Sequence, residues 1–193
     1  MSSHVPPAIS IPAVEAVEQR AERVLAEVPP WIWDGESLPV PVADIADSCF
    51  GLLLREVEDL SAAGGVPALR DGQSFSGLLL PDAREIWVNA GEATRWPTRR
   101  RFTIGHELGH FCLHHHHGEA VWCRTACVEE ELRAPERPAL PPAEEEANAF
   151  AAALLMPAGL IRKHYRKNMD FFGFCDLFGA SGSAMGRRLH AVV

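Results

Sequence analysis

The sequence predicts an α+β fold in which a small sheet precedes two functionally important helices. Three short apolar runs, at residues 51–57, 76–80 and 85–89, have the length and the flanking turn residues of strands. Apolar residues then recur at helical spacing over residues 98–113 and 144–155. Strands that are grouped ahead of helices, rather than alternating with them, are typical of an α+β arrangement.

Composition and charge exclude several classes of protein. The chain has 193 residues, 47% hydrophobic and 23% charged, which is ordinary for a globular domain with a real core. No stretch approaches the roughly 20 apolar residues that span a bilayer, and Met1–Pro12 lacks the basic and apolar regions of a secretory signal. We therefore expect a cytoplasmic protein without a membrane partner. The net charge of −8 argues against direct nucleic-acid binding and favours a protein partner.

The first part of the chain is expected to form an extension, residues 1–40, ahead of the main domain, residues 41–193. Apolar residues at helical spacing predict a helix over residues 13–28, which ends at two prolines and either lies at the periphery or faces a partner. The two tryptophans that follow, Trp31 and Trp33, either anchor a loop to the core or form a binding patch.

The expected sheet begins after a short helix at residues 41–49. Gly51–Val57 is predicted to be its first strand. Ser76–Leu80 and Glu85–Asn89 are joined by the four residues Pro81–Arg84, which predicts a hairpin.

A helix that starts near Thr98 carries the motif His-Glu-x-x-His. We expect the Thr98 side chain to cap its first turn, and apolar residues such as Phe102 and Leu108 to give it a buried side. Gly109 costs roughly 1 kcal/mol relative to alanine inside a helix, which indicates that another element packs closely there.

On a helix this motif can form part of a metal site. His106 and His110 are four residues apart and return to nearly the same face, so both imidazoles can reach one ion. Glu107 projects about 100° around the helix from His106. This direction suits a general base that takes a proton from the water activated by the metal. The competing interpretation is an exposed or core histidine pair with no ligand role.

Three arginines, Arg99 to Arg101, stand near the start of this helix and oppose its macrodipole. They either pair with acidic residues of the chain or contact an acidic substrate. Beyond the motif, His114 is either a fourth inward imidazole or the helix end, whereas His116 is a poor ligand candidate because Leu113 stands where a glycine would have to turn the backbone.

Residues 118–143 contain several prolines and charged residues and are predicted to be a long loop inserted beside the site. Five cysteines in the whole chain fit reduced thiols better than a disulfide framework. Two of them, Cys123 and Cys127, make a second metal site conceivable, although no matching second pair exists.

A second helix starts with three glutamates and stops before Pro157. Glu144 and Asn148 are four apart and share a face, so Glu144 can complete a His-His-Glu site while Asn148 holds a ligand in place. The helix register favours Glu144 over Glu145 and Glu146. The alternative is that all three acids only complement the helix dipole.

The last part of the chain is predicted to contain an apolar helix at residues 171–178, a turn at residues 179–181, and a helix capped by Ser181. Two helices joined by a tight turn are also found in DNA-binding proteins, and Arg187 and Arg188 lie on the second. Because the chain is acidic, we expect core packing or docking of a protein partner instead.

Two blocks together resemble the ImmA/IrrE family of metallopeptidases. The first is Arg-Phe-Thr-Ile-Gly-His-Glu-Leu-Gly-His, residues 101–110, followed by Leu-His at residues 113–114. The second is Glu-Glu-Glu-Ala-Asn-Ala-Phe-Ala-Ala-Ala-Leu-Leu-Met-Pro, residues 144–157. The resemblance covers roughly residues 40–190.

The resemblance implies a zinc-dependent endopeptidase with a zincin-like core, in which a third ligand, a glutamate, follows the HExxH helix on a second helix. By motif position, His106, His110 and Glu144 would bind zinc and Glu107 would be the catalytic acid and base. Members of the family cut a helix-turn-helix repressor and so release genes of stress responses or mobile elements. For this chain the competing hypothesis is a non-proteolytic antirepressor or toxin-like binding module with a structural zinc. Asn148 and His114 are the candidates for a supporting or oxyanion-stabilising role.

Overall fold

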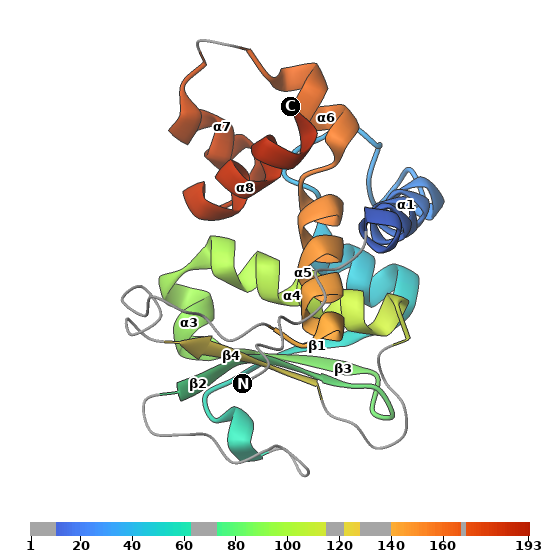
Figure 1. Cartoon of the computed structure of the whole chain (residues 1–193). Helices are drawn as coiled ribbons and strands as arrows, with labels where there is room; N and C mark the ends of the chain where they lie inside the picture. The colour runs from blue at the N-terminus through green and yellow to red at the C-terminus, as the bar shows by residue number, and fades with distance from the viewer. Residues whose placement is uncertain (1–10, 63–72, 115–121, 128–139, 167–168) are drawn as a thin grey trace, which may run out of the picture.

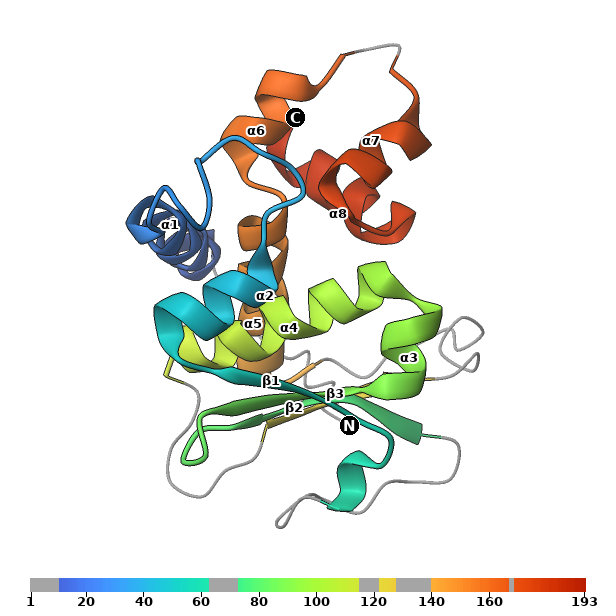
Figure 2. The same ribbon diagram turned by 180° about the vertical axis from the view of Figure 1, so that it is seen from behind.

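The computed structural model describes residues 11–62, 73–114, 122–127, 140–166 and 169–193. A four-stranded sheet forms the lower layer, helix α4 lies across its upper face, and α5 crosses α4 and leads up to a group of three C-terminal helices (Figure 1). The view from behind shows α2 and α1 beside α4 and α5, on the same side of the sheet (Figure 2). The predicted α+β class is confirmed.

The elements have the following bounds. The helices are α1 (Ile11–Glu27), α2 (Val42–Asp44), the π-helical turn η1 (Ile45–Cys49), the 3-10 turn η2 (Leu60–Ala62), α3 (Ala90–Arg95), α4 (Pro97–Cys112), α5 (Pro142–Leu155), α6 (Ala158–His164), α7 (Phe171–Phe178) and α8 (Gly182–Val192). The strands are β1 (Leu53–Val57), β2 (Gln73–Leu80), β3 (Glu85–Asn89) and β4 (Trp122–Cys127).

The strand order in the sheet is β1-β3-β2-β4. The predicted hairpin is confirmed, because β2 and β3 are antiparallel and Leu80 pairs with Glu85. The strand predicted over residues 51–57 is confirmed as β1, which runs parallel to β3. The pairing of β2 with β4 is antiparallel and shifts register between Phe75 and Gly77. Such a bulge bends a strand and re-aims its side chains.

The prediction of a loop over residues 118–143 was wrong for Trp122–Cys127, which form the edge strand β4, and for Pro142 and Ala143, which begin α5. This strand exists because the exposed edge of β2 offers a row of backbone donors and acceptors, so the partner rather than a sequence pattern decides the conformation. Residues 118–121 and 128–139 of the predicted loop lie outside the described residues.

Helix α4 begins differently from the prediction. Its first residue is Pro97, it follows Trp96, and no side chain caps it, so Thr98 lies inside the first turn. A proline at this position removes one backbone N–H that would have no partner in the helix, and its fixed φ suits the helical conformation. The helix thus begins with a residue suited to its first position, and Thr98, the next residue, does not serve as its cap.

The prediction of close packing at Gly109 is confirmed. A Cβ atom there would lie 3.1 Å from the Ala147 carbonyl oxygen and 3.1 Å from a ring carbon of Phe150, both on α5. One turn earlier, a Cβ on Gly105 would be 3.4 Å from the Ala151 Cβ. The small residues of both helices let α4 and α5 approach closely, and this approach brings the first turn of α5 to the motif of α4.

Helix α1 belongs to the main core. Val17, Ala21 and Val24 are buried in the same cluster as the apolar residues of α4 and α5. The segment after α1 is fixed by Trp33, which is buried and donates its indole N–H to the Ser37 carbonyl at 2.7 Å, whereas Trp31 is 85% exposed. Only one of the two tryptophans therefore anchors this segment.

The predicted C-terminal pair of helices is confirmed. Gly179 ends α7 with a φ of 60°, and the Ser181 hydroxyl accepts a hydrogen bond from the Ala184 N–H at the start of α8. Arg188 of α8 is buried and donates to the Met156 carbonyl and to the Glu18 carboxylate, so this arginine is part of the core rather than of a DNA-binding face. Among the described residues, no helix is long and apolar enough to cross a bilayer.

Candidate metal centre

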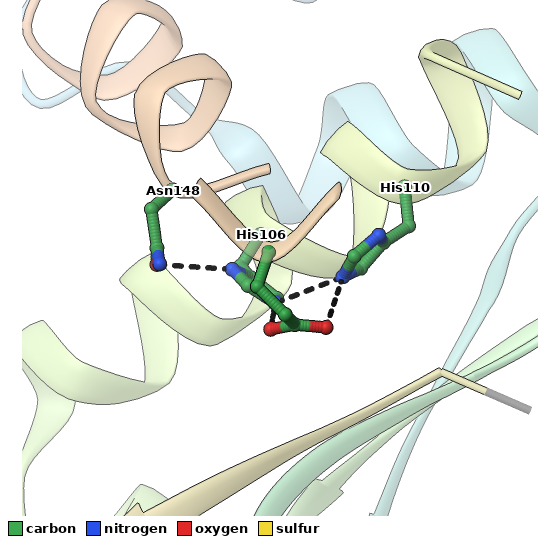
Figure 3. Close-up of polar contacts among 4 residues, drawn as sticks. His106, His110 and Asn148 are labelled. Carbon is green, nitrogen blue, oxygen red and sulfur yellow. Dashed lines mark hydrogen bonds and ion pairs between the residues drawn. The ribbon is translucent and has the colours of Figure 1, made fainter. Parts of the chain in front are cut away.

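His106 and His110 lie one turn apart on α4 and are both fully buried. Their Nε2 atoms are 3.0 Å apart and their rings meet edge to face, with centroids 4.6 Å apart. Figure 3 shows His106 between Asn148 and His110, with the dashed contacts converging below α5. The helical spacing thus directs both imidazoles to one point, as the sequence indicates.

Glu144 comes from the first turn of α5 and meets both histidines. Its Oε2 is 3.2 Å from Nε2 of His106, and its Oε1 is 3.2 Å from Nε2 of His110. Neither Glu145 nor Glu146 belongs to the cluster of potential ligand residues. The close packing of α5 on the two glycines of α4 is what brings Glu144 to this place.

The geometry of the three side chains fits a metal ion. One ligand atom from each of His106, His110 and Glu144 lies within 4.8 Å of the others. Donors that surround a zinc ion at about 2.0–2.2 Å in a tetrahedral arrangement are about 3.3–3.6 Å apart, only slightly more than the observed 3.0–3.2 Å. Two imidazoles and one carboxylate also match the ligand types of catalytic zinc sites, in which one position stays open.

The charge of the cluster suits a cation as well. Burial raises the pKa of the Glu144 carboxyl, but hydrogen bonds from His106 and His110, together with their charges, outweigh burial and lower the pKa to about 2. The carboxylate is therefore ionised at neutral pH. Metal ligands must be deprotonated, so this ionisation keeps Glu144 ready to bind.

Asn148 orients one of the histidines. Its Oδ1 lies 3.1 Å from Nδ1 of His106, one helical turn after Glu144. Because an amide oxygen can only accept, Nδ1 of His106 carries a proton, so in the neutral ring that a metal requires the lone pair would be on Nε2 and face the cluster. A hydrogen bond of this kind is typical of histidines that bind metal.

Glu107 is fully buried and is not one of the three clustered side chains. A Cβ on Gly77 of β2 would be 3.2 Å from Oε1 of Glu107 and 2.3 Å from Cγ2 of Thr103. The sheet therefore passes directly beneath this carboxylate. The role of Gly77 was not predicted, although an isolated glycine in an apolar strand is a recognised signal of a bulge or a close approach.

His114, the remaining candidate whose side chain the structure describes, does not join the cluster. Helix α4 ends at Cys112, and His114 lies beyond this end, exposed and with a φ of 57°. His116 lies outside the described residues. Cys123 and Cys127 belong to the edge strand β4, and a metal site formed by these two residues stays a prediction.

The arginines near the start of α4 mostly pair within the chain. Arg99 lies 3.6 Å from the Glu92 carboxylate and Arg100 lies 2.9 Å from that of Glu56. Arg101 donates to the Val40 carbonyl at 2.6 Å. The expected pairing with acidic residues of the chain is thus observed for two of the three.

Comparison with known proteins gives the family. The sequence profile of the IrrE N-terminal-like domain, a peptidase family, matches residues 70–190. This range contains both helices of the metal cluster and the C-terminal helices. No curated protein matches the chain. Since the match spans more than half of the sequence, the chain belongs to the peptidase family of the IrrE N-terminal-like domain.

Proposed function

We propose that this protein is a zinc-dependent endopeptidase of the cytoplasm that cuts a helix-turn-helix repressor. The observation that carries the proposal is the meeting of His106, His110 and Glu144 at donor distances that fit one metal ion, with Glu107 buried in the next position of the same helix. The family match supports a metallopeptidase.

Zinc is the metal that this set of ligands favours. Two histidines and a glutamate leave one position for water or substrate, as in HExxH peptidases with a glutamate as third ligand, and the fold would then be a zincin-like core. Zinc bound there would supply Lewis acidity, which lowers the pKa of a coordinated water to about 7.

Side chains of the protein would transfer the proton and position the ligands. Glu107 would take the proton of the attacking water and return it to the nitrogen of the leaving amine, since a buried carboxylate beside the open position can act first as base and then as acid. Asn148 would hold His106 in the tautomer that binds metal. No oxyanion donor is assigned, and the position of His114 beyond the end of α4 argues against that role.

The repressor as substrate rests on the resemblance to ImmA/IrrE peptidases. Cleavage would release genes of a stress response or of a mobile element. The net charge of −8 is consistent with a protein rather than a nucleic-acid partner.

The test is to incubate the zinc-loaded protein with the helix-turn-helix regulator encoded nearest to it. Wild type should give discrete fragments by mass spectrometry, and Glu107→Gln should give none while it keeps its zinc. Glu145→Gln is the matched control because it removes the same charge from a residue outside the cluster. Removal of zinc with a chelator should stop cleavage and added zinc should restore it.

An uncut regulator that forms a stable complex with both wild type and Glu107→Gln would instead indicate a binding module with a structural metal. Metal content measured in parallel distinguishes loss of the ion from loss of the base. Cleavage by Glu107→Gln at the wild-type rate would contradict the role of this carboxylate.

A further inference from the structure

A cavity of about 280 Å³ lies between the first half of α4, the end of α5 and the turn that leads into α8. Its apolar lining comes from Trp96, Phe102, Leu155 and Met156, and its charged lining from Arg99 and Arg187. In Figure 1 this is the region where α8 lies above the first turns of α4.

The charges of this cavity are unusual for an acidic protein. No carboxylate among the described residues forms a salt bridge with Arg187, whereas the adjacent Arg188 is paired with Glu18. The Arg99 guanidinium stacks on the Trp96 ring, 4.9 Å from its centroid. Its Nη1 is 3.6 Å from the Glu92 carboxylate, a long ion pair that neutralises the Arg99 charge only in part. The cavity therefore presents positive charge beside an apolar floor.

The cavity and the metal cluster lie along one face of α4. Phe102 precedes His106 by four residues and Arg99 precedes it by seven, spacings that return to the same side of a helix. At 1.5 Å per residue, these positions are about 6 and 10 Å from His106 along the axis. An extended peptide advances about 3.3 Å per residue, so the cavity is two or three residues away from a bond held at the cluster.

We propose that this cavity is a specificity subsite that receives an acidic side chain of the polypeptide substrate, two or three residues from the cleaved bond. The proposal rests on the proposed peptidase function. The volume is smaller than the roughly 300–1,000 Å³ of pockets for drug-sized ligands, which fits a side chain rather than a cofactor. The methylene groups of aspartate or glutamate would pack on Trp96 and Phe102, and the carboxylate would meet Arg187.

The test uses the full-length zinc-loaded protein and begins with the bond that wild type cuts in the regulator, or in a degenerate peptide library. Each acidic residue within three positions of that bond is then replaced by its amide. One replacement should lower kcat/KM by about three- to tenfold, mainly through KM, as expected for a partly exposed charged hydrogen bond.

The substrate with the acidic residue and the substrate with its amide are then assayed with variants of Arg187. Arg187→Gln should bring the ratio of acidic to amide kcat/KM close to one, Arg187→Lys should keep part of it, and Arg187→Glu should reverse it. Arg162→Gln is the matched control, because Arg162 is exposed on α6 and does not line the cavity. Thermal unfolding of each variant shows whether its fold is retained.

The outcomes separate the two proposals. Cleavage with no acidic residue near the bond, or a wild-type ratio retained by Arg187→Gln, would overturn the subsite and leave the peptidase intact. Failure of wild type to cut the regulator and every library peptide, with zinc bound, would overturn the peptidase function and the subsite with it.

Discussion

At the scale of single residues, Gly77 is the position where the sheet constrains the proposed base. A methyl group there would lie 2.3 Å from Cγ2 of Thr103 and 3.2 Å from Oε1 of Glu107, so something must move. We expect Gly77→Ala to destabilise the fold by about 1–3 kcal/mol and to lower kcat/KM. Urea unfolding and peptidase assays measure both effects.

Two variants sharpen this prediction. Thr103→Ser removes the methyl group that clashes most, so the double variant Gly77→Ala/Thr103→Ser should regain stability. Gly159→Ala is the control, because nothing lies within 4 Å of its Cβ position. If Gly77→Ala proves as stable and as active as Gly159→Ala, the close approach is not a constraint.

We expect Asn148 to act through His106 rather than on substrate. Loss of its hydrogen bond in Asn148→Ala should weaken zinc binding by about 10- to 100-fold, since partners of this kind hold the ring and its tautomer. Asn148→Asp keeps an acceptor and should restore most of the affinity. Competition with a zinc-binding dye measures the affinities, and equal values for all three proteins would contradict the assignment.

At the scale of elements, the contact between α4 and α5 decides whether the ligands meet. Gly109→Ala gains up to about 1 kcal/mol of helix propensity, but its methyl group would press on the backbone of Ala147 at 3.1 Å. Overpacking costs about 1–3 kcal/mol, so we expect a net loss of stability and weaker zinc binding as Glu144 moves away.

Gly105→Ala is the paired control in the same helix. Its nearest neighbour is the Ala151 Cβ at 3.4 Å, an ordinary contact, so the gain in propensity should make the substitution neutral or stabilising. Thermal unfolding of the zinc-free proteins isolates the packing effect. If Gly109→Ala is more stable than wild type, α5 can shift away from the added methyl group without a loss of stability.

The same elements show what the sequence could predict. The hairpin, α4, α5 and the C-terminal pair follow from local patterns of apolar residues and turns, and these are confirmed. Strand β4 could not be predicted, because its conformation depends on the edge of β2, which is distant in sequence. The start of α4 was missed because the helix begins at Pro97 and has no side-chain cap. Glu144 could be placed only through helix register.

At the scale of the whole molecule, α8 is tied to α1 by an ion pair that joins the two ends of the chain. Arg188 is buried and its Nη1 lies 2.7 Å from the Glu18 carboxylate. Glu18→Gln would leave this charge poorly compensated, so we expect a loss of about 2–4 kcal/mol in the free energy of unfolding.

Glu15→Gln is the control for this loss, because Glu15 is exposed on the same helix and its carboxylate accepts a hydrogen bond from Gln19 of that helix. Urea unfolding compares the two variants. Equal stability of Glu18→Gln and Glu15→Gln would mean that the Met156 carbonyl alone satisfies Arg188.

The split of the proposed metal ligands between α4 and α5 would have a consequence for the lifetime of the protein. A bound ion would act as a reversible cross-link between two helices that are separated by the segment before α5. By mass action, an ion at 100 times its Kd stabilises the folded state by about 2.7 kcal/mol. Loss of the metal would thus make the protein easier to degrade as well as inactive. The abundance of this protein would therefore follow the supply of its metal.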